Sequence, residues 1–280
     1  MIAATDIAAR AAELMIQAAT QLRPDVREAL EAALVRERNE RARAILATLL
    51  ENDEIARRDG VPLCQDTGTT WIRLRLAAGE RVEGDLQAAC DAACAQASQS
   101  AGLRDSLVFD AYDDRRNTQT NTPVMLEVVQ GSEPCIQLDV MLKGAGSDNA
   151  SRVVMLDPDS TDDDIEAAVL AAVTEKASMA CPPLIIGLGI GGTFDTVGKL
   201  SKQALLRPLT AEPSTPSVTA LQERLLTAVN ATGIGPAALG GDTTALAVQI
   251  QTAPCHIAAM PLAINLCCNA LRSASCELKL

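Results

Sequence analysis

The sequence is poor in aromatic side chains. Its 280 residues include one tryptophan, one tyrosine and two phenylalanines. Hydrophobic types nevertheless make up 48% of the chain, which excludes an intrinsically disordered protein. The chain is long enough for one large domain or two modest ones. The composition therefore predicts a folded protein whose core is built from Ala, Val, Ile and Leu.

Acidic residues outnumber basic residues in the sequence, and long apolar runs are absent. It has 24 Lys and Arg against 36 Asp and Glu, a formal net charge of −12. This balance argues against nucleic acid or an anionic membrane as a partner, although local arginines could still hold a small anion. No apolar run reaches membrane-spanning length, and the N-terminus lacks the pattern of a signal peptide. We expect a cytoplasmic protein.

Cysteine, in contrast, is abundant. The nine cysteines are an odd number, and a reducing cytosol disfavours disulfides. Most cysteines in such a chain are small buried hydrophobic side chains. Cys90 and Cys94 share one face of a predicted helix among alanines, so we expect both to be buried. The surplus still allows a metal site built from a few of the others.

Hydrophobic periodicity predicts an α+β fold of mixed helices with mainly antiparallel strands. We predict one domain over 1–280, whose first 55 or so residues are helical. Thr5 or Asp6 is the expected N-cap of the first helix. The predicted helices are 4–20, 24–52, 84–100, 159–179, 195–206 and 218–230. The predicted strands are 71–76, 106–109, 124–130, 135–142, 184–186 and 244–251, with a hairpin joining 124–130 to 135–142.

A glycine-rich stretch follows Cys181, with the sequence Cys-Pro-Pro-Leu-Ile-Ile-Gly-Leu-Gly-Ile-Gly-Gly-Thr. It predicts a strand, a glycine turn and a helix, and its Gly-x-Gly-x-x-Gly spacing fits a dinucleotide-binding fingerprint. That fingerprint also needs an acidic residue about twenty positions further on, at the end of a second strand. The corresponding segment, which begins at Arg207, shows no strand. A dinucleotide-binding enzyme therefore ranks third among the three functions that this sequence allows.

Other cysteines lie beside polar residues in irregular segments, where functional residues tend to occur. Cys64 opens a Cys-Gln-Asp sequence, Cys181 precedes the glycines, and Cys267 and Cys268 lie near the C-terminus. Three thiolates from distant segments could hold an iron–sulfur cluster with one iron left open, which could polarise a carboxylate and a hydroxyl group. The compact Cys-x-x-Cys spacing of ferredoxins is absent, so the residues alone leave this question open.

Four motifs together resemble the iron–sulfur-dependent hydro-lyases, namely the class I fumarate hydratases and the L-tartrate dehydratases. The resemblance covers nearly the whole chain and matches the α subunit, or the N-terminal domain, of these enzymes. The motifs are Val61-Pro-Leu-Cys-Gln-Asp-Thr-Gly, Lys143-Gly-Ala-Gly-Ser-Asp-Asn, Cys181-Pro-Pro…Gly-Ile-Gly-Gly-Thr and Ala253-Pro-Cys-His-Ile-Ala…Cys268-Asn-Ala-Leu-Arg272.

The resemblance implies a single cluster-binding domain and a set of site residues. Cys268 is preferred over Cys267 because the family pattern Cys-x-Ala-x-Arg falls on it. The implied roles are ligation of a [4Fe–4S] cluster by Cys64, Cys181 and Cys268, catalysis by Asp66 and His256, and substrate binding by Gln65, Arg104 and Gly146.

The chain departs from the family pattern in two ways. Ala145 and Asp148 stand where a third glycine and a glutamate are expected, which are small changes. A second domain that supplies further substrate-binding residues has no counterpart. The resemblance therefore implies a β subunit, in a heterodimer or heterotetramer. The implied reaction is hydration or dehydration of a four-carbon dicarboxylate, such as fumarate, L-tartrate or mesaconate.

A non-catalytic protein that binds zinc or a cluster is the alternative hypothesis. His256, Cys267, Cys268 and Cys276 could chelate zinc near the C-terminus. This hypothesis leaves the Cys64-Gln-Asp sequence and Arg104 without a role. Zinc at one per chain without acid-labile sulfide would favour it.

Overall fold

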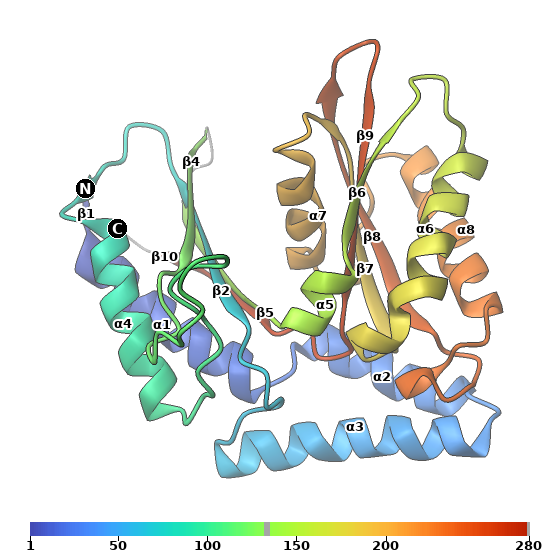
Figure 1. The fold of residues 1–280 in the computed structure, drawn as a ribbon, viewed down its shortest axis with the longest axis horizontal. Helices are drawn as coiled ribbons and strands as arrows, with labels where there is room; N and C mark the ends of the chain where they lie inside the picture. Colours follow the sequence, from blue (N-terminus) through green and yellow to red (C-terminus); the bar gives the residue numbers. More distant parts are fainter. Residues whose placement is uncertain (132–134, 279–280) are drawn as a thin grey trace. The chain divides into compact units, whose positions relative to one another are not determined.

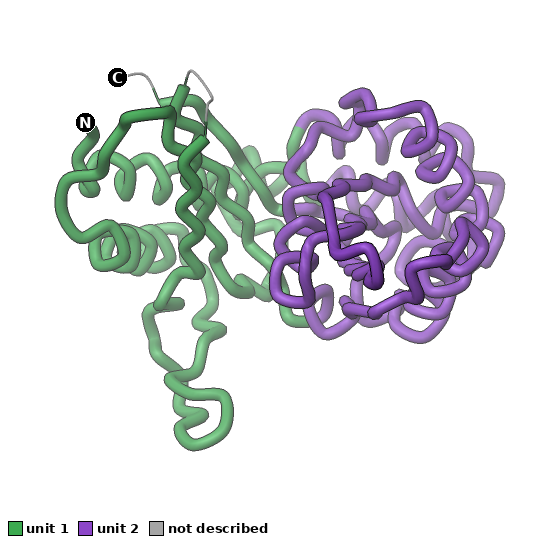
Figure 2. Tube along the Cα trace, turned by 90° about the horizontal axis from the view of Figure 1, so that it is seen from above, with its two compact units in different colours: residues 1–23, 52–145, 272–280 green, residues 24–51, 146–271 purple. Residues whose placement is uncertain are grey.

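The computed structural model describes residues 1–131 and 135–278 (Figure 1). The chain forms two compact units (Figure 2). Unit 1 comprises residues 1–23, 52–145 and 272–280, and unit 2 comprises residues 24–51 and 146–271. Helices and mixed sheets occur in both units, which confirms the α+β class. The single domain over 1–280 stays a prediction.

Unit 1 contains a four-stranded sheet in the order β10-β5-β2-β4, with two helices on one face (Figure 1). Alternate residues of the strands point towards these helices, and Ile72, Leu74 and Leu138 are buried there. The elements of the sheet layer are α1 (Ala4–Thr20), α4 (Leu86–Ser100), β2 (Thr69–Leu76), β4 (Met125–Gln130), β5 (Ile136–Lys143) and β10 (Ser273–Leu278). A short parallel pair, β1 (Ile2–Ala3) and β3 (Val82–Glu83), adjoins them.

The two helices of unit 1 follow the predicted ranges. The predicted N-cap of α1 was wrong: the cap is Ala3, because the chain enters the helix directly from the extended residues of β1. Asp85 caps α4 by accepting a hydrogen bond from the amide of Ala88 at 3.0 Å. Cys90 and Cys94 are buried against α1, as expected.

The predicted hairpin between 124–130 and 135–142 is wrong. β2 lies between β4 and β5, parallel to the former and antiparallel to the latter. β2 and β5 are the two central strands, and both carry mainly buried residues. The turn residues 132–134 lie outside the described residues. The predicted strand 106–109 contributes only an isolated bridge between Val108 and Asn117.

Unit 2 contains a second four-stranded sheet, in the order β6-β9-β7-β8. Helices α6 and α8 cover one face and α7 covers the other (Figure 1). Leu184, Ile186 and Leu188 of the central strand point into the core beneath α6 and α8. The elements are β6 (Arg152–Leu156), α6 (Asp162–Lys176), β7 (Leu184–Gly192), α7 (Val197–Leu206), α8 (Pro216–Ala231), β8 (Ala245–Cys255) and β9 (Met260–Cys267), with short 3₁₀ turns η1 (Ala177–Ala180) and η2 (Pro236–Ala238).

The glycine turn was predicted too early in the chain. β7 runs through Gly187 and Gly189 and ends at Gly192. A β-carbon on Gly187 would lie 2.4 Å from the Ser201 carbonyl oxygen, and one on Gly189 would lie 2.4 Å from that of Val197. These two glycines therefore allow α7 to pack directly on the strand, and they do not form a phosphate-binding turn.

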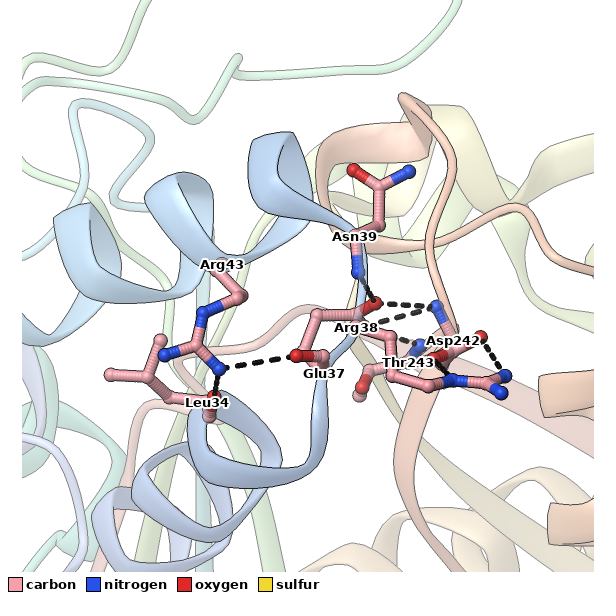
Figure 3. A network of polar contacts seen from close by, with 7 residues as sticks. All are labelled: Leu34, Glu37, Arg38, Asn39, Arg43, Asp242 and Thr243. Carbon is pink, nitrogen blue, oxygen red and sulfur yellow. Dashed lines mark hydrogen bonds and ion pairs between the residues drawn. The ribbon is translucent and has the colours of Figure 1, made fainter.

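The predicted helix 24–52 is two helices, α2 (Pro24–Arg36) and α3 (Glu40–Asp59). The break is organised by Glu37, whose charged side chain is buried (Figure 3). Its carboxylate accepts hydrogen bonds from the amides of Asn39, Asp242 and Thr243 at 3.0–3.1 Å. The Asn39 side chain then caps α3 through the amide of Ala42.

Most of the motif that begins at Lys143 forms the short helix α5 (Ala145–Ala150). No helix in the described part of the chain combines the length and the apolarity needed to cross a membrane.

Candidate active site

The predicted site residues are divided evenly between the two units. Unit 1 carries Cys64, Gln65, Asp66 and Arg104, and unit 2 carries Gly146, Cys181, His256 and Cys268. Within neither unit do the described residues gather three or more His, Cys, Asp or Glu side chains into a metal-binding group. Each half of the candidate site is therefore described by itself.

In unit 1, the loop that carries Cys64 is fixed at both ends. The Leu63 amide donates to the Ala19 carbonyl at 2.8 Å, and the Asn52 side chain donates to the Leu63 carbonyl at 3.0 Å. After the cysteine, Gly68 adopts φ +74° and packs against the end of β5. A β-carbon on Gly68 would lie 2.1 Å from the Lys143 carbonyl oxygen, so only glycine fits.

The Cys64 sulfur is half-buried and lies in a polar setting. It accepts a hydrogen bond from the amide of Asp66 at 3.4 Å, and its thiol lies 3.5 Å from Gln65 Oε1. A cysteine binds a metal through its thiolate form. The Gln65 side chain is exposed to solvent.

Asp66 is anchored to the loop that precedes α5. Its Oδ2 accepts a hydrogen bond from the Ala145 amide at 2.8 Å. The neighbouring residue, Gly144, has little space around it: a β-carbon there would lie 2.9 Å from Asp66 Oδ2 and 3.3 Å from Arg272 Nη2. Asp66 and Arg272 thus converge on the same glycine.

Arg104 follows α4 in an irregular segment. Its carbonyl accepts a hydrogen bond from the side chain of Asn121 at 3.2 Å, and Asn121 also accepts one from the Ser106 amide at 2.7 Å. Asn121 is buried, so it fixes the backbone around Arg104. The guanidinium itself is exposed and forms no ion pair with any residue that the structure describes. Such a group is available to bind a carboxylate.

In unit 2, the segments of Cys181 and Cys268 are joined by Asn269. The carbonyl of Cys181 accepts hydrogen bonds from the Asn269 amide at 3.3 Å and from its Nδ2 at 2.9 Å. The Cys268 amide donates to Ser147 Oγ at 3.2 Å. Cys181 is exposed with φ +51°, and Cys268 is half-buried just beyond the end of β9. Two of the three predicted ligands therefore lie in connected loops.

Gly146 has a packing role in this arrangement. A β-carbon there would lie 2.3 Å from the carbonyl oxygen of Met179, two residues before Cys181. The close contact holds α5 against η1 and places Ser147 next to Cys268. Contact between Gly146 and a substrate stays a prediction.

The adjacent residues Cys267 and Cys268 have different surroundings. Cys267 is 4% exposed and pairs with Ile185 of β7 inside the sheet, whereas Cys268 lies outside it. This supports the choice of Cys268 as the ligand. The zinc alternative also needs Cys276, whose sulfur accepts a hydrogen bond from Arg10 Nε at 3.4 Å.

His256 occupies the exposed turn between β8 and β9. Its Nδ1 accepts a hydrogen bond from the Ala258 amide at 3.1 Å. A neutral ring in this position therefore carries its proton on Nε2, which is free to exchange it.

A family model described as "Fumarate hydratase (Fumerase)" matches residues 8–277. The chain belongs to the fumarate hydratase family. The α subunit of L(+)-tartrate dehydratase from Escherichia coli K12 is 28% identical over 256 residues, which cover 90% of this chain and 84% of the relative. A protein of Methanocaldococcus jannaschii with a provisional name for the same subunit is 34% identical over 275 residues, 96% of each chain.

Membership of the fumarate hydratase family confirms the resemblance and the reaction type. Hydratases and dehydratases both make or break a carbon–oxygen bond by adding or removing water, so the chain is a lyase of the hydro-lyase type. The dinucleotide hypothesis loses its basis, because the glycines that suggested it pack against α7.

Three residues of the site were not singled out from the sequence. Asn269 donates to the Cys181 carbonyl, and Ser147 accepts from the Cys268 amide. Arg272 and Asp66 both lie next to Gly144. Asn269 and Arg272 belong to the motif that begins at Cys268, and Ser147 belongs to the one that begins at Lys143. Their presence in the motifs was a signal, but nothing in the sequence indicated what they contact.

Proposed function

We propose that this chain is the α subunit of a two-subunit hydro-lyase that adds water to a four-carbon dicarboxylate, or removes it. The observation that carries the proposal is the pair of hydrogen bonds from Asn269 to the Cys181 carbonyl. These bonds connect the loop that carries Cys181 to the loop that carries Cys268. The names of the relatives, which specify an α subunit, support the need for a β subunit. A heterodimer or heterotetramer follows from this need.

The chemistry of three cysteines fits a [4Fe–4S] cluster. Cys64, Cys181 and Cys268 are half-buried or exposed, whereas Cys90, Cys94 and Cys267 are buried among apolar side chains. Three protein thiolates leave one iron of such a cluster without a protein ligand. When bound, the cluster supplies that iron as a Lewis acid for the hydroxyl and one carboxylate of the substrate. The number of cysteines is odd, and we place the protein in the reducing cytoplasm, where disulfides are disfavoured.

The residues of unit 1 would bind and protonate the substrate. Arg104 would form paired hydrogen bonds with a carboxylate, and the exposed Gln65 amide would donate to a second oxygen. Asp66 would give its proton to the departing hydroxyl group, which then leaves as water. Its Oδ2 is held by the Ala145 amide, so Oδ1 is the oxygen left for this transfer.

The elimination also needs a base for the proton on the neighbouring carbon. We place that base on the β subunit, and we assign His256 Nε2 to proton exchange near the site. In the hydration direction the same groups act in reverse order. The backbone of Gly146 would border the substrate.

The decisive test is anaerobic reconstitution of the α subunit with iron and sulfide, followed by assay with the β subunit. Fumarate, L-malate, L-tartrate and mesaconate should be offered separately, and the α subunit without its partner is the matched control. We expect iron and acid-labile sulfide in the chain and turnover of at least one substrate by the pair alone. A protein that holds zinc without sulfide, and that turns over none of the four, would overturn the proposal and favour the non-catalytic alternative.

A further inference from the structure

Arg272 is a buried cation that directly precedes β10. The residue is 3% exposed, and its Nε is buried without a hydrogen-bond acceptor. No ion pair to its guanidinium occurs among the residues that the structure describes. Its backbone is fixed, because the Arg272 carbonyl accepts a hydrogen bond from the Leu142 amide at 2.9 Å where β10 joins β5.

The guanidinium is directed at the loop that holds Asp66. Arg272 Nη2 would lie 3.3 Å from a β-carbon on Gly144, and Asp66 Oδ2 would lie 2.9 Å from the same β-carbon. The missing side chain of Gly144 leaves room between the two charged groups. Asp66 and Gly144 are half-buried and Gln65 is exposed, so this place lies close to solvent.

A buried charge without a partner is costly. Removing a cation from water destabilises the fold unless an anion and hydrogen-bond acceptors compensate for it. Asp66 lies near the guanidinium but forms no direct ion pair with it, and its Oδ2 accepts the Ala145 amide. A carboxylate from a bound ligand could therefore supply the direct acceptors that the guanidinium lacks.

We propose that Arg272 binds a carboxylate group of the substrate and is a second carboxylate-binding cation of this chain beside Arg104. A guanidinium donates two parallel hydrogen bonds to one carboxylate, which is the geometry that a dicarboxylate offers at each end. Arg272 belongs to unit 1, which also carries the proposed acid Asp66 and the cation Arg104. The inference rests on the proposed function and names a residue that the sequence motifs left without a role.

The test uses the reconstituted enzyme with both subunits and the variants Arg272→Gln and Arg272→Lys. Succinate is the probe for binding, because it has two carboxylates but neither a hydroxyl group nor a double bond. Calorimetry should show succinate affinity reduced at least tenfold in Arg272→Gln and reduced less in Arg272→Lys, which keeps the charge. Arg207→Gln is the matched control, since Arg207 donates hydrogen bonds to the carbonyls of Ile250 and Glu212, which belong to unit 2.

Further readouts separate substrate binding from a structural role. Iron and sulfide content and the visible spectrum should equal those of the unsubstituted enzyme, and KM should rise more than kcat falls. Millimolar guanidinium chloride should partly restore the succinate affinity of Arg272→Gln but not alter that of Arg207→Gln. If Arg272→Gln fails to fold, Arg272→Lys still carries the test.

Two results would overturn the inference. One is unchanged succinate affinity in the variants. If the visible spectrum or the sulfide content changes while the affinity does not, Arg272 serves the cluster and not the substrate. The other is an unsubstituted enzyme that turns over its substrate but does not bind succinate. Failure of the proposed function is recognised separately, as absence of turnover and of sulfide in the unsubstituted pair of subunits.

Discussion

Asn269 donates two hydrogen bonds to the carbonyl of Cys181, one from its amide at 3.3 Å and one from Nδ2 at 2.9 Å. Because Asn269 directly follows Cys268, these bonds couple the loops of two predicted cluster ligands. The geometry of one cysteine therefore depends on the other through a side chain that binds no metal itself.

Replacing Asn269 by alanine should loosen this coupling. The lost Nδ2 bond contributes about 1 kcal/mol, which corresponds to a roughly fivefold change in an equilibrium. We expect iron to be lost about fivefold more readily to a chelator, with little change in the midpoint of thermal unfolding. Asn230→Ser is the control, because Asn230 accepts hydrogen bonds from the Thr244 and Ala245 amides and should lower thermal stability instead. Equal iron retention in Asn269→Ala and the unsubstituted chain would refute the coupling.

The contact between α7 and β7 predicts that replacing Gly189 of β7 lowers the free energy of unfolding and that replacing Gly198 of α7 raises it. Gly189→Ala forces a β-carbon to within 2.4 Å of the Val197 carbonyl and should reduce the free energy of unfolding by about 2 kcal/mol, as overpacking typically does. Gly198→Ala, within α7, meets no atom within 4 Å and should increase it by about 0.5–1 kcal/mol. Urea denaturation of both variants measures the difference. A Gly189→Ala variant as stable as the unsubstituted protein would mean that the glycines serve something other than helix packing.

The sequence predicted best those elements that depend on local patterns. Helical periodicity located α1 and α4, and alternation located β2. The position of β2 between β4 and β5 could not be predicted, because strand order depends on contacts between distant segments. The break after α2 has the same origin: Glu37 is held by the amide of Asp242, which is 205 residues away in the chain.

The candidate site was predictable to a similar extent. The sequence placed Cys64, Cys181 and Cys268 in irregular segments, but the hydrogen bonds from Asn269 that connect the Cys181 and Cys268 loops needed the structure. The burial of Arg272 was not predicted, since arginine is usually exposed.

Glu37 should make stability depend on acid pH. Burial alone would raise the pKa of its carboxyl, but hydrogen bonds from the Asp242 and Asn39 amides and from Thr243 outweigh it, and the pKa is lowered. A lowered pKa stabilises the fold above the unfolded value near 4.5, and this stability is lost as the pH falls through the folded value.

Glu37→Gln should therefore reduce the free energy of unfolding by about 2 kcal/mol at pH 7, the typical contribution of hydrogen bonds to a charged group. The difference from the unsubstituted protein should shrink below pH 4.5. Glu51→Gln, at an exposed position of α3, is the matched control and should have almost no effect. Denaturation curves from pH 3 to pH 7 decide the matter, and a pH-independent difference would contradict the role of the carboxylate.

The two buried thiols of α4 predict a loss of stability in alkali. Burial raises the pKa of Cys90 from 9.0 to about 11 and that of Cys94 to about 12. Between pH 9 and 11 the unfolded thiols ionise while the folded thiols stay protonated, so stability falls as the pH rises, by about 1.4 kcal/mol per pH unit for each thiol. Replacing both cysteines by alanine should remove this slope, and Cys255→Ala, at an exposed cysteine, should preserve it. An unchanged slope in the double variant would show that other groups cause the alkaline transition.

The proposal that three cysteines hold a cluster is tested most directly by comparing Cys268→Ser with Cys267→Ser. The two sulfurs are adjacent in sequence, yet Cys267 lies inside the sheet and Cys268 outside it. The measurement is the iron and acid-labile sulfide bound per chain after anaerobic reconstitution, together with hydro-lyase activity in the presence of the β subunit. We predict that Cys268→Ser loses cluster and activity, as Cys64→Ser and Cys181→Ser do, and that Cys267→Ser retains both. A full cluster and full activity in Cys268→Ser would contradict the account.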